Sequence, residues 1–157
     1  MKTTTKLGVW RTAAAVGLAL VAAHGHADTG AAGLTAAVLT RWLDGYRAAW
    51  ENRDPDRAAS LFTDNATYQE TPYDKPFEGP AGVREYWANV TRDQRNVKFE
   101  YQVIAVSGNT GIAHWSAKFE SAPSGAPVGL DGIFVLDFAP DGRCSRLREW
   151  WHLEPAK

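Results

Sequence analysis

The sequence is short of cysteine, of histidine and of clustered basic charge, and each shortage excludes a class of protein. Cys144 is the only cysteine of 157 residues, so the chain forms no internal disulfide and its stability comes from packing. Lys and Arg are scattered along the chain, which argues against a nucleic-acid partner. The four histidines show no metal-ligand spacing, and phosphate-binding glycine loops, serine elbows and dinucleotide fingerprints are missing. We therefore expect neither a metal nor a cofactor.

Long apolar runs are also missing, and the one candidate near the N-terminus is short. Three basic residues precede an alanine-rich run over residues 12–23, and small residues lead to Asp28. This order predicts a secretory signal peptide over residues 1–27, in a run too short for a membrane anchor. We expect a periplasmic or secreted protein without membrane contact after cleavage; a mis-assigned start on a cytoplasmic protein is the alternative. Cleavage removes three positive charges and no negative one, so the net charge falls from −1 to −4.

Aromatic side chains are plentiful. The chain has seven Trp, five Tyr and six Phe, and 45% of its residues are apolar. Such side chains either fill a core or wall a cavity for a small apolar molecule, and composition leaves both readings open. The length suits one domain, which we place at residues 35–155 after a flexible lead-in at 28–34.

The first half of this domain has a helical period. Apolar residues recur at helical spacing at Leu39, Trp42, Leu43, Tyr46 and Trp50. Asp54 and Pro55 supply the cap and first turn of a second helix, which we expect to stop near Asp64. Gly79 and Pro80 open a third helix after a loop.

The second half has a strand period of two. Alternation predicts strands over 97–103, 113–119, 128–138 and 144–152, joined by glycine-containing turns, and a shorter strand over 66–70. Three helices followed by an antiparallel meander predict an α+β fold with the helices on one face of a curved sheet. A sheet wrapped on helices in this way leaves a cavity at its open end.

Several motifs together resemble a known family. They are Leu61-Phe62-Thr63-Asp64-Asn65-Ala66-Thr67, Tyr86-Trp87, Asp141-Gly142-Arg143 and Arg148-Glu149-Trp150-Trp151. From about Val38 to Leu153 the sequence resembles the SnoaL-like branch of the nuclear transport factor 2-like superfamily, which includes ketosteroid isomerase. The resemblance implies a cone-shaped domain of three N-terminal helices packed on a curved antiparallel sheet. It says little of function, because the fold hosts isomerases, cyclases, dehydratases, epoxide hydrolases and non-catalytic binding or dimerising domains.

The same resemblance implies a catalytic pair. Tyr46 falls where ketosteroid isomerase keeps its oxyanion-binding tyrosine, and Glu70 falls where its proton-shuttling carboxylate lies. Phe134 takes the place of its second donor, a protonated aspartate, which argues against steroid isomerisation. We expect the pocket to be lined by Trp50, Tyr68, Tyr86, Trp87, Trp115, Phe134, Leu147, Glu149 and Trp151.

The residues themselves allow such chemistry and also simpler roles. If Glu70 points inward with Tyr68, desolvation raises its proton affinity as a general acid or base requires, and Tyr46 offers a hydroxyl to a developing enolate. The alternatives are that Glu70 pairs with Arg84 or Lys75 and that Tyr46 is an ordinary core residue.

Two further residues leave similar choices. Glu149 is either a second pocket carboxylate or the partner of an arginine. His114 lies on the polar side of its strand, where we expect it to be exposed or at an interface.

Three hypotheses of different classes follow. The first is an exported enzyme doing cofactor-free acid–base chemistry on a small apolar, polyketide-, steroid- or terpenoid-like molecule. The second is a binding module that holds such a ligand without turnover, and the third is a dimerisation domain. Under each we expect a homodimer formed through the outer face of the sheet, which carries Ile133, Val135 and Trp150.

Overall fold

Helices precede most of the strands along the chain, in the order that the periodicity predicts. The computed structural model describes residues 33–155. The elements are α1 (Ala36–Asn52), α2 (Pro55–Ser60), β1 (Phe62–Gln69), β2 (Phe77–Glu78), α3 (Gly79–Val90), β3 (Gln94–Ser107), β4 (Thr110–Ser121), β5 (Pro127–Phe138) and β6 (Cys144–Leu153). The predicted signal peptide of residues 1–27 lies outside the described residues, as does most of the lead-in. None of the helices described in residues 33–155 combines the length and apolarity needed to cross a membrane.

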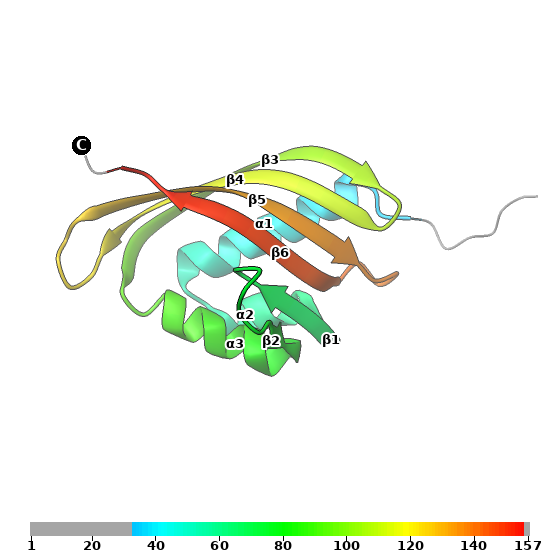
Figure 1. Cartoon of the computed structure of the whole chain (residues 1–157), viewed down its shortest axis with the longest axis horizontal. Helices are drawn as coiled ribbons and strands as arrows, with labels where there is room; N and C mark the ends of the chain where they lie inside the picture. Colours follow the sequence, from blue (N-terminus) through cyan, green and yellow to red (C-terminus); the bar gives the residue numbers. More distant parts are fainter. Residues whose placement is uncertain (1–32, 156–157) are drawn as a thin grey trace, which may run out of the picture.

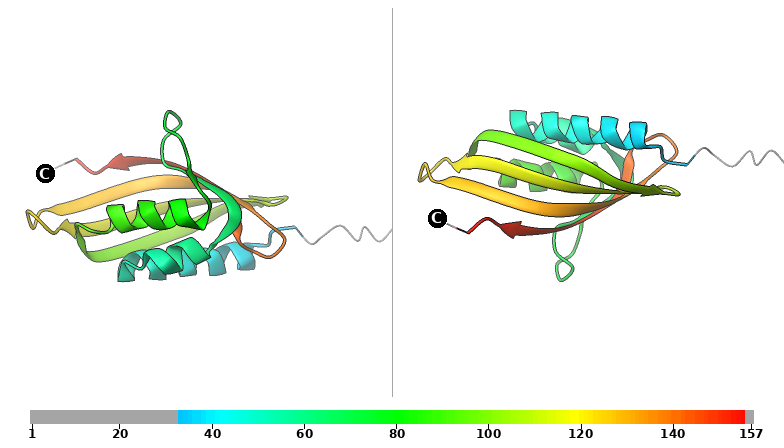
Figure 2. Two further views of the ribbon diagram at one scale, coloured as in Figure 1. Left: turned by 90° about the horizontal axis from the view of Figure 1, so that it is seen from below. Right: turned by 90° about the horizontal axis from the view of Figure 1, so that it is seen from above.

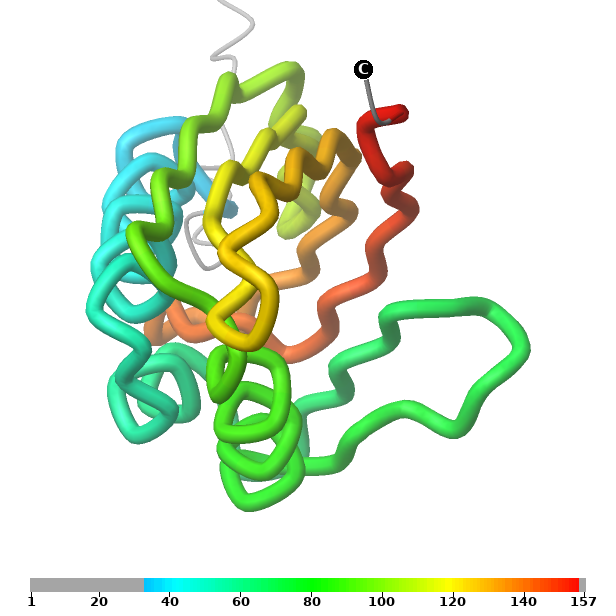
Figure 3. Tube along the Cα trace, turned by 90° about the vertical axis from the view of Figure 1, so that its left-hand side faces the viewer, coloured from blue at the N-terminus to red at the C-terminus, as the bar shows by residue number. Residues whose placement is uncertain are grey.

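The strands form one sheet in the order β2-β1-β6-β5-β4-β3, and all three helices cover the same face of it (Figures 1 and 2). The meander from β3 to β6 is antiparallel, as expected. An end-on view shows the sheet curling over α1 and α3, while the segment between β1 and β2 projects from the body (Figure 3). The predicted α+β fold, with helices on one face of a curved sheet, is confirmed.

The helix boundaries follow from their capping residues. The Thr35 hydroxyl accepts a hydrogen bond from the backbone N–H of Val38 and starts α1. The Asp54 carboxylate accepts from the N–H of Arg57, with Pro55 in the first turn of α2. Between the caps, α1 buries the stripe that the sequence shows, from Leu39 to Trp50, against β3 and the rest of the sheet.

The expected end of the second helix is wrong. It ends at Ser60 and not near Asp64, and β1 already begins at Phe62. The cause is the carbonyl of Leu61, which leaves the helix and accepts from the indole N–H of Trp42 and from the backbone N–H of Cys144. β1 therefore lies parallel to β6, with Tyr68 beside Leu147, so the sheet is mixed and not purely antiparallel.

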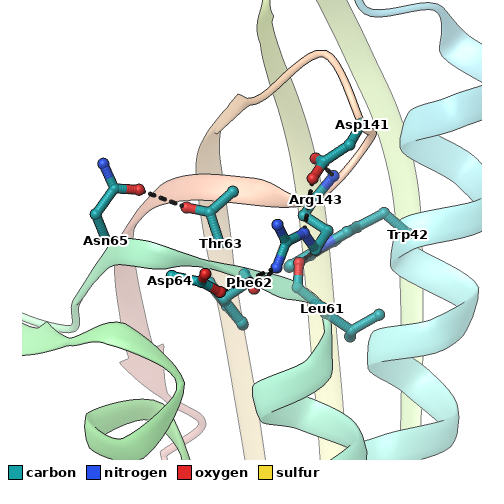
Figure 4. Close-up of polar contacts among 8 residues, drawn as sticks. All are labelled: Trp42, Leu61, Phe62, Thr63, Asp64, Asn65, Asp141 and Arg143. Atoms are coloured by element: carbon teal, nitrogen blue, oxygen red, sulfur yellow. Dashed lines mark hydrogen bonds and ion pairs between the residues drawn. The ribbon is translucent and has the colours of Figure 1, made fainter.

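A polar cluster holds this parallel junction in place (Figure 4). The Arg143 guanidinium lies between the carboxylates of Asp141 and Asp64, at 2.8 and 3.3 Å, and also reaches the carbonyl of Phe62. Because Arg143 follows the turn before β6 and Asp64 lies in β1, the cluster fixes how the two strands start relative to each other. The register then shifts between Phe62 and Thr67, beyond which Tyr68 lies beside Leu147.

Aromatic rings fill the space between the helices and the sheet. At one end Trp42 packs edge-on against Phe62 and Phe138 and closes the core. At the other end the rings of Trp50, Trp87 and Trp115 meet and line an open space. The core and the cavity are thus two ends of one aromatic layer.

Candidate functional site

A cavity of about 340 Å³ lies at the open end of this layer. Helices α1 and α3 form one wall, and the ends of β1, β4, β5 and β6 form the other. Its lining residues are Tyr46, Trp50, Tyr68, Glu70, Tyr86, Trp87, Val90, Gln94, Trp115, Phe119, Val128, Leu130, Glu149, Trp151 and Leu153. The volume lies near the small end of the roughly 300–1,000 Å³ of small-molecule sites, and the exposed side chains of Trp151 and Leu153 stand at its mouth.

A chain of three side chains crosses the deep end of the cavity. The hydroxyls of Tyr46 and Tyr68 are 3.0 Å apart, and the Tyr68 hydroxyl donates to Glu149 Oε1 at 2.8 Å. All three side chains are buried, with exposures of 1%, 1% and 4%. The chain joins α1, β1 and β6, so the packing of all three elements fixes its geometry.

Glu149 is a buried acid without a positively charged neighbour. Among residues 33–155 it takes part in no ion pair, and the nearby arginines of β6 pair with Asp137 instead. Burial raises the pKa of Glu149 to about 8; the hydrogen bond from Tyr68 opposes this rise, and the charge of Glu70 adds to it. The carboxyl group is therefore mainly protonated at neutral pH.

Glu70 lies just beyond the end of β1, half-buried at the wall of the same cavity. Partial burial raises its pKa, although hydrogen bonds from Trp151 and Tyr86 favour its charged form. It forms no ion pair with Arg84, whose partner is Asp56, nor is one found with Lys75 in the described part of the chain. Of the two roles that the sequence left open, the arrangement matches the pocket carboxylate.

The three tyrosines around these acids are neutral hydroxyl groups. Burial raises the pKa of Tyr46, Tyr68 and Tyr86 well above the ordinary value, and the charge of Glu149 raises each further. A hydroxyl that keeps its proton over the whole physiological range can donate a hydrogen bond and does not act as a base. The cavity thus pairs carboxyl groups that can exchange protons with phenols that can stabilise negative charge.

Most of the expected site residues line this one cavity. They are Tyr46, Trp50, Tyr68, Glu70, Tyr86, Trp87, Trp115, Glu149 and Trp151. Phe134 and Leu147 are not among its lining residues. Phe134 is fully buried and packs against the rings of Tyr46 and Trp115, which face the cavity in its place. Leu147 is fully buried in the sheet between Tyr68 and Leu136.

The indole N–H groups of the buried tryptophans fall into two kinds. Trp42 donates to the carbonyl of Leu61, and Trp50 donates to Gln94 Oε1 at 2.7 Å. The N–H groups of Trp87 and Trp115 are buried with no acceptor among the described residues. Buried donors without acceptors are rare, and both of these belong to side chains of the cavity wall.

Sequence reasoning missed part of the site. The hydrogen bonds from Tyr46 through Tyr68 to Glu149 join residues far apart in the sequence, so no local sequence motif predicts them. Gln94 was missed because it precedes the clear alternation that starts at Val97, although it is buried and holds Trp50. Val128, Leu130 and Leu153, at the mouth, occupy the alternating strand positions that face inward. This alternation could have predicted them as lining residues.

The outer face of the sheet carries the remaining histidine of interest. His114 lies there with its ring nitrogen 2.8 Å from Asp131 on β5, while its neighbour Trp115 points to the cavity. In residues 33–155 no three His, Cys, Asp or Glu side chains gather in a way that could hold a metal ion.

The comparisons with known proteins agree on the fold. The model of the SnoaL-like domain family matches residues 39–147, whereas no curated protein matches significantly. A putative isomerase from Bacillus subtilis superposes with a TM-score of 0.66 at 22% identity, over 74% of this chain and 87% of that one. SalBIII, an epoxide hydrolase/cyclase-like enzyme in pyran ring formation in the polyether salinomycin, gives 0.63 at 22% identity, over 72% and 89%. A type 2 hexachlorocyclohexane dehydrochlorinase, LinA, gives 0.63 at 16% identity, over 77% and 88%.

Proposed function

Because this chain belongs to the SnoaL-like domain family, we propose that its cavity binds a small apolar molecule and carries out acid–base chemistry on it without a cofactor. The observation that carries this proposal is the meeting of Glu70, Glu149 and Tyr46 in one aromatic cavity. An apolar wall with a few convergent polar groups of shifted pKa is the usual form of a small-molecule site.

The residues suit a proton transfer next to a carbonyl group. In the proposed reaction the Glu70 carboxylate removes a proton from the carbon beside the carbonyl, and the electron pair moves to the carbonyl oxygen as an enolate. The Tyr46 hydroxyl stabilises that oxygen, as donors in a dry site do most effectively. Glu70 then returns its proton to a carbon conjugated with the enolate, which isomerises the substrate, or to the same carbon, which exchanges its hydrogen with solvent; the enzyme is unchanged in both cases.

Proteins of similar structure support a catalytic cavity. A putative isomerase, an epoxide hydrolase/cyclase-like enzyme and a dehydrochlorinase share this fold. The polyketide-, steroid- or terpenoid-like class is proposed for this chain on the size and the apolar wall of its cavity.

Proton exchange of a simple ketone tests the proposal directly. α-Tetralone in deuterated buffer should lose its α-proton signals by NMR faster with the protein than without it. The Glu70→Gln variant should lose this acceleration, and Tyr46→Phe should reduce it by about 10²–10³. Glu100→Gln and Tyr73→Phe change an exposed glutamate and an exposed tyrosine that do not line the cavity, and both should exchange like the wild type.

The alternative is a binding module of the same fold without turnover. In that case tryptophan fluorescence would report saturable binding of apolar ligands, because Trp50, Trp87 and Trp115 line the cavity. The exchange rate would equal that of buffer for every ligand that binds. Such a result would remove the catalytic half of the proposal and keep the binding half.

A further inference from the structure

The hydrogen-bond chain from Tyr46 through Tyr68 to Glu149 has a direction. All three side chains line the cavity; Tyr46 and Glu149 are the two ends of the chain and Tyr68 is its middle, with oxygens separated by 3.0 and 2.8 Å. A phenol has one proton to donate, and an ionised carboxylate has none. The number of protons on the three groups therefore decides which way each bond points.

With Glu149 ionised, every proton points inward. Tyr68 donates its proton to Glu149 Oε1, so its oxygen can only accept from Tyr46. The single proton of Tyr46 is then used inside the protein, and Tyr46 offers a ligand only lone pairs.

With Glu149 protonated, the bonds can point outward. A proton on Oε1 meets the Tyr68 oxygen at 2.8 Å. Tyr68 then donates to Tyr46, and the proton of Tyr46 is free for a ligand.

We propose that Glu149 sets, through Tyr68, whether the Tyr46 hydroxyl donates to a bound ligand or accepts from it. The proposal rests on the proposed ligand site and assigns Glu149 and Tyr68 a positioning role that neither the family match nor the similar structures provide. It deepens that function by naming the ligand: a hydrogen-bond acceptor such as a ketone below the titration of Glu149, and a donor such as an alcohol above it.

The surroundings of Glu149 bring its loss of a proton into the range from pH 7 to pH 9. The titratable groups that face it are Tyr46 from α1, Tyr68 and Glu70 from β1 and its end, and Tyr86 from α3. β5 presents Phe134 opposite Glu149, and none of these groups is a cation. Burial raises the pKa of Glu149 to about 8, so its proton leaves over the range from pH 7 to pH 9.

The ligand-free protein gives the first test. With tyrosine labelled at the ring carbon that bears the hydroxyl, the NMR signals of Tyr46 and Tyr68 should shift together in one step near pH 8. Tyr46→Phe and Tyr68→Phe assign the two signals, and Glu149→Gln should abolish the step. If the Tyr46 signal stays constant from pH 6 to pH 10 in the wild type, the proton of Glu149 does not reach Tyr46 and the inference is wrong.

A matched pair of neutral ligands gives the second test. The affinity for α-tetralone should fall about tenfold between pH 7 and pH 9, because only the protonated form of Glu149 supports the donor state of Tyr46. The affinity for the alcohol α-tetralol should not fall. Glu149→Gln, whose amide keeps a donor facing Tyr68, should bind the ketone equally at both pH values, and Tyr68→Phe should also lose the dependence.

Glu70→Gln separates the two carboxyl groups. It should keep the pH dependence of ketone binding, and loss of that dependence would assign the titration to Glu70 and overturn the inference. If neither ligand binds while the NMR step is present, the proposed function fails and the switch of Tyr46 stands. If both ligands bind with no difference in pH dependence, the switch fails and the ligand site stands.

Discussion

At the scale of single residues, the burial of Glu149 lowers the free energy of unfolding in the pH range where most proteins are most stable. Its pKa rises from an ordinary 4.5 to about 8 because it is buried. The folded chain thus keeps a proton that the unfolded chain releases, and the free energy of unfolding falls as pH rises from about 4.5 to 8. The stabilisation by the bound proton is complete only below this range.

Replacing Glu149 by glutamine should remove this dependence. Glutamine stays neutral at every pH, so Glu149→Gln should be more stable than the wild type by about 4 kcal/mol at pH 8 and by little at pH 4.5. Urea unfolding at the two pH values measures the difference, with Glu100→Gln as the control for an exposed glutamate. An equal difference at both pH values would show that Glu149 is charged in the folded protein.

The sequence predicts which residues face inward better than it predicts what they contact. Alternation placed Glu70 beside Tyr68, and helical spacing placed Tyr46 on the buried stripe, where both line the cavity. The same reasoning could not choose between an arginine and a cavity as the neighbour of Glu149, because its partner Tyr68 is on another strand. Phe134 has the inward parity of a lining residue, but larger rings lie between it and the open space.

At the scale of elements, β5 shapes the cavity through a residue with no side chain. Gly132 lies opposite Trp115 on β4 and Trp151 on β6. A Cβ at this position would lie 2.8 Å from two ring atoms of Trp115 and 2.7 Å from the carbonyl oxygen of Trp150. The indole of Trp115 can lie flat on the sheet only because position 132 is glycine.

Gly132→Ala should therefore displace Trp115 and destabilise the protein by about 1–3 kcal/mol. Neither neighbour can yield easily, since one is backbone and the other is a fully buried ring. Urea unfolding measures the loss of stability, and tryptophan fluorescence reports the new environment of Trp115. Ser116→Ala, on the outward side of β4, is the control, and a Gly132→Ala variant as stable as the wild type would contradict the prediction.

The elements differ in how far the sequence determines them. The meander from β3 to β6 follows from alternation and glycine turns, because each strand pairs with its neighbour along the chain. The start of β1 does not, because it depends on the carbonyl of Leu61 and on Arg143, far away in the sequence. Local patterns extended α2 to near Asp64, and a contact between distant segments ended it at Ser60.

At the scale of the whole molecule, the outer face of the sheet has apolar side chains that are exposed or half-buried in the described residues. Trp150 is 48% exposed on β6, beside the half-buried Ile133 on β5, and the half-buried Val135 and Ile112 continue the patch across β5 and β4. Contiguous apolar surface of this kind marks an interface more often than an isolated exposed side chain does. We propose that two copies of the chain pair through this face. Export, in contrast, concerns residues outside the described ones and stays a prediction from the sequence.

A charge in the middle of this patch tests the pairing. Trp150→Asp places an uncompensated carboxylate between the two sheets, so sedimentation should show a dimer for the wild type and a monomer for the variant. Trp150 does not line the cavity, so ketone exchange per chain should survive the separation. Tyr73→Asp, on the segment that projects beyond β1, exposes the same charge elsewhere and should remain dimeric. A wild-type protein that sediments as a monomer at high concentration would show that two copies do not pair through this patch.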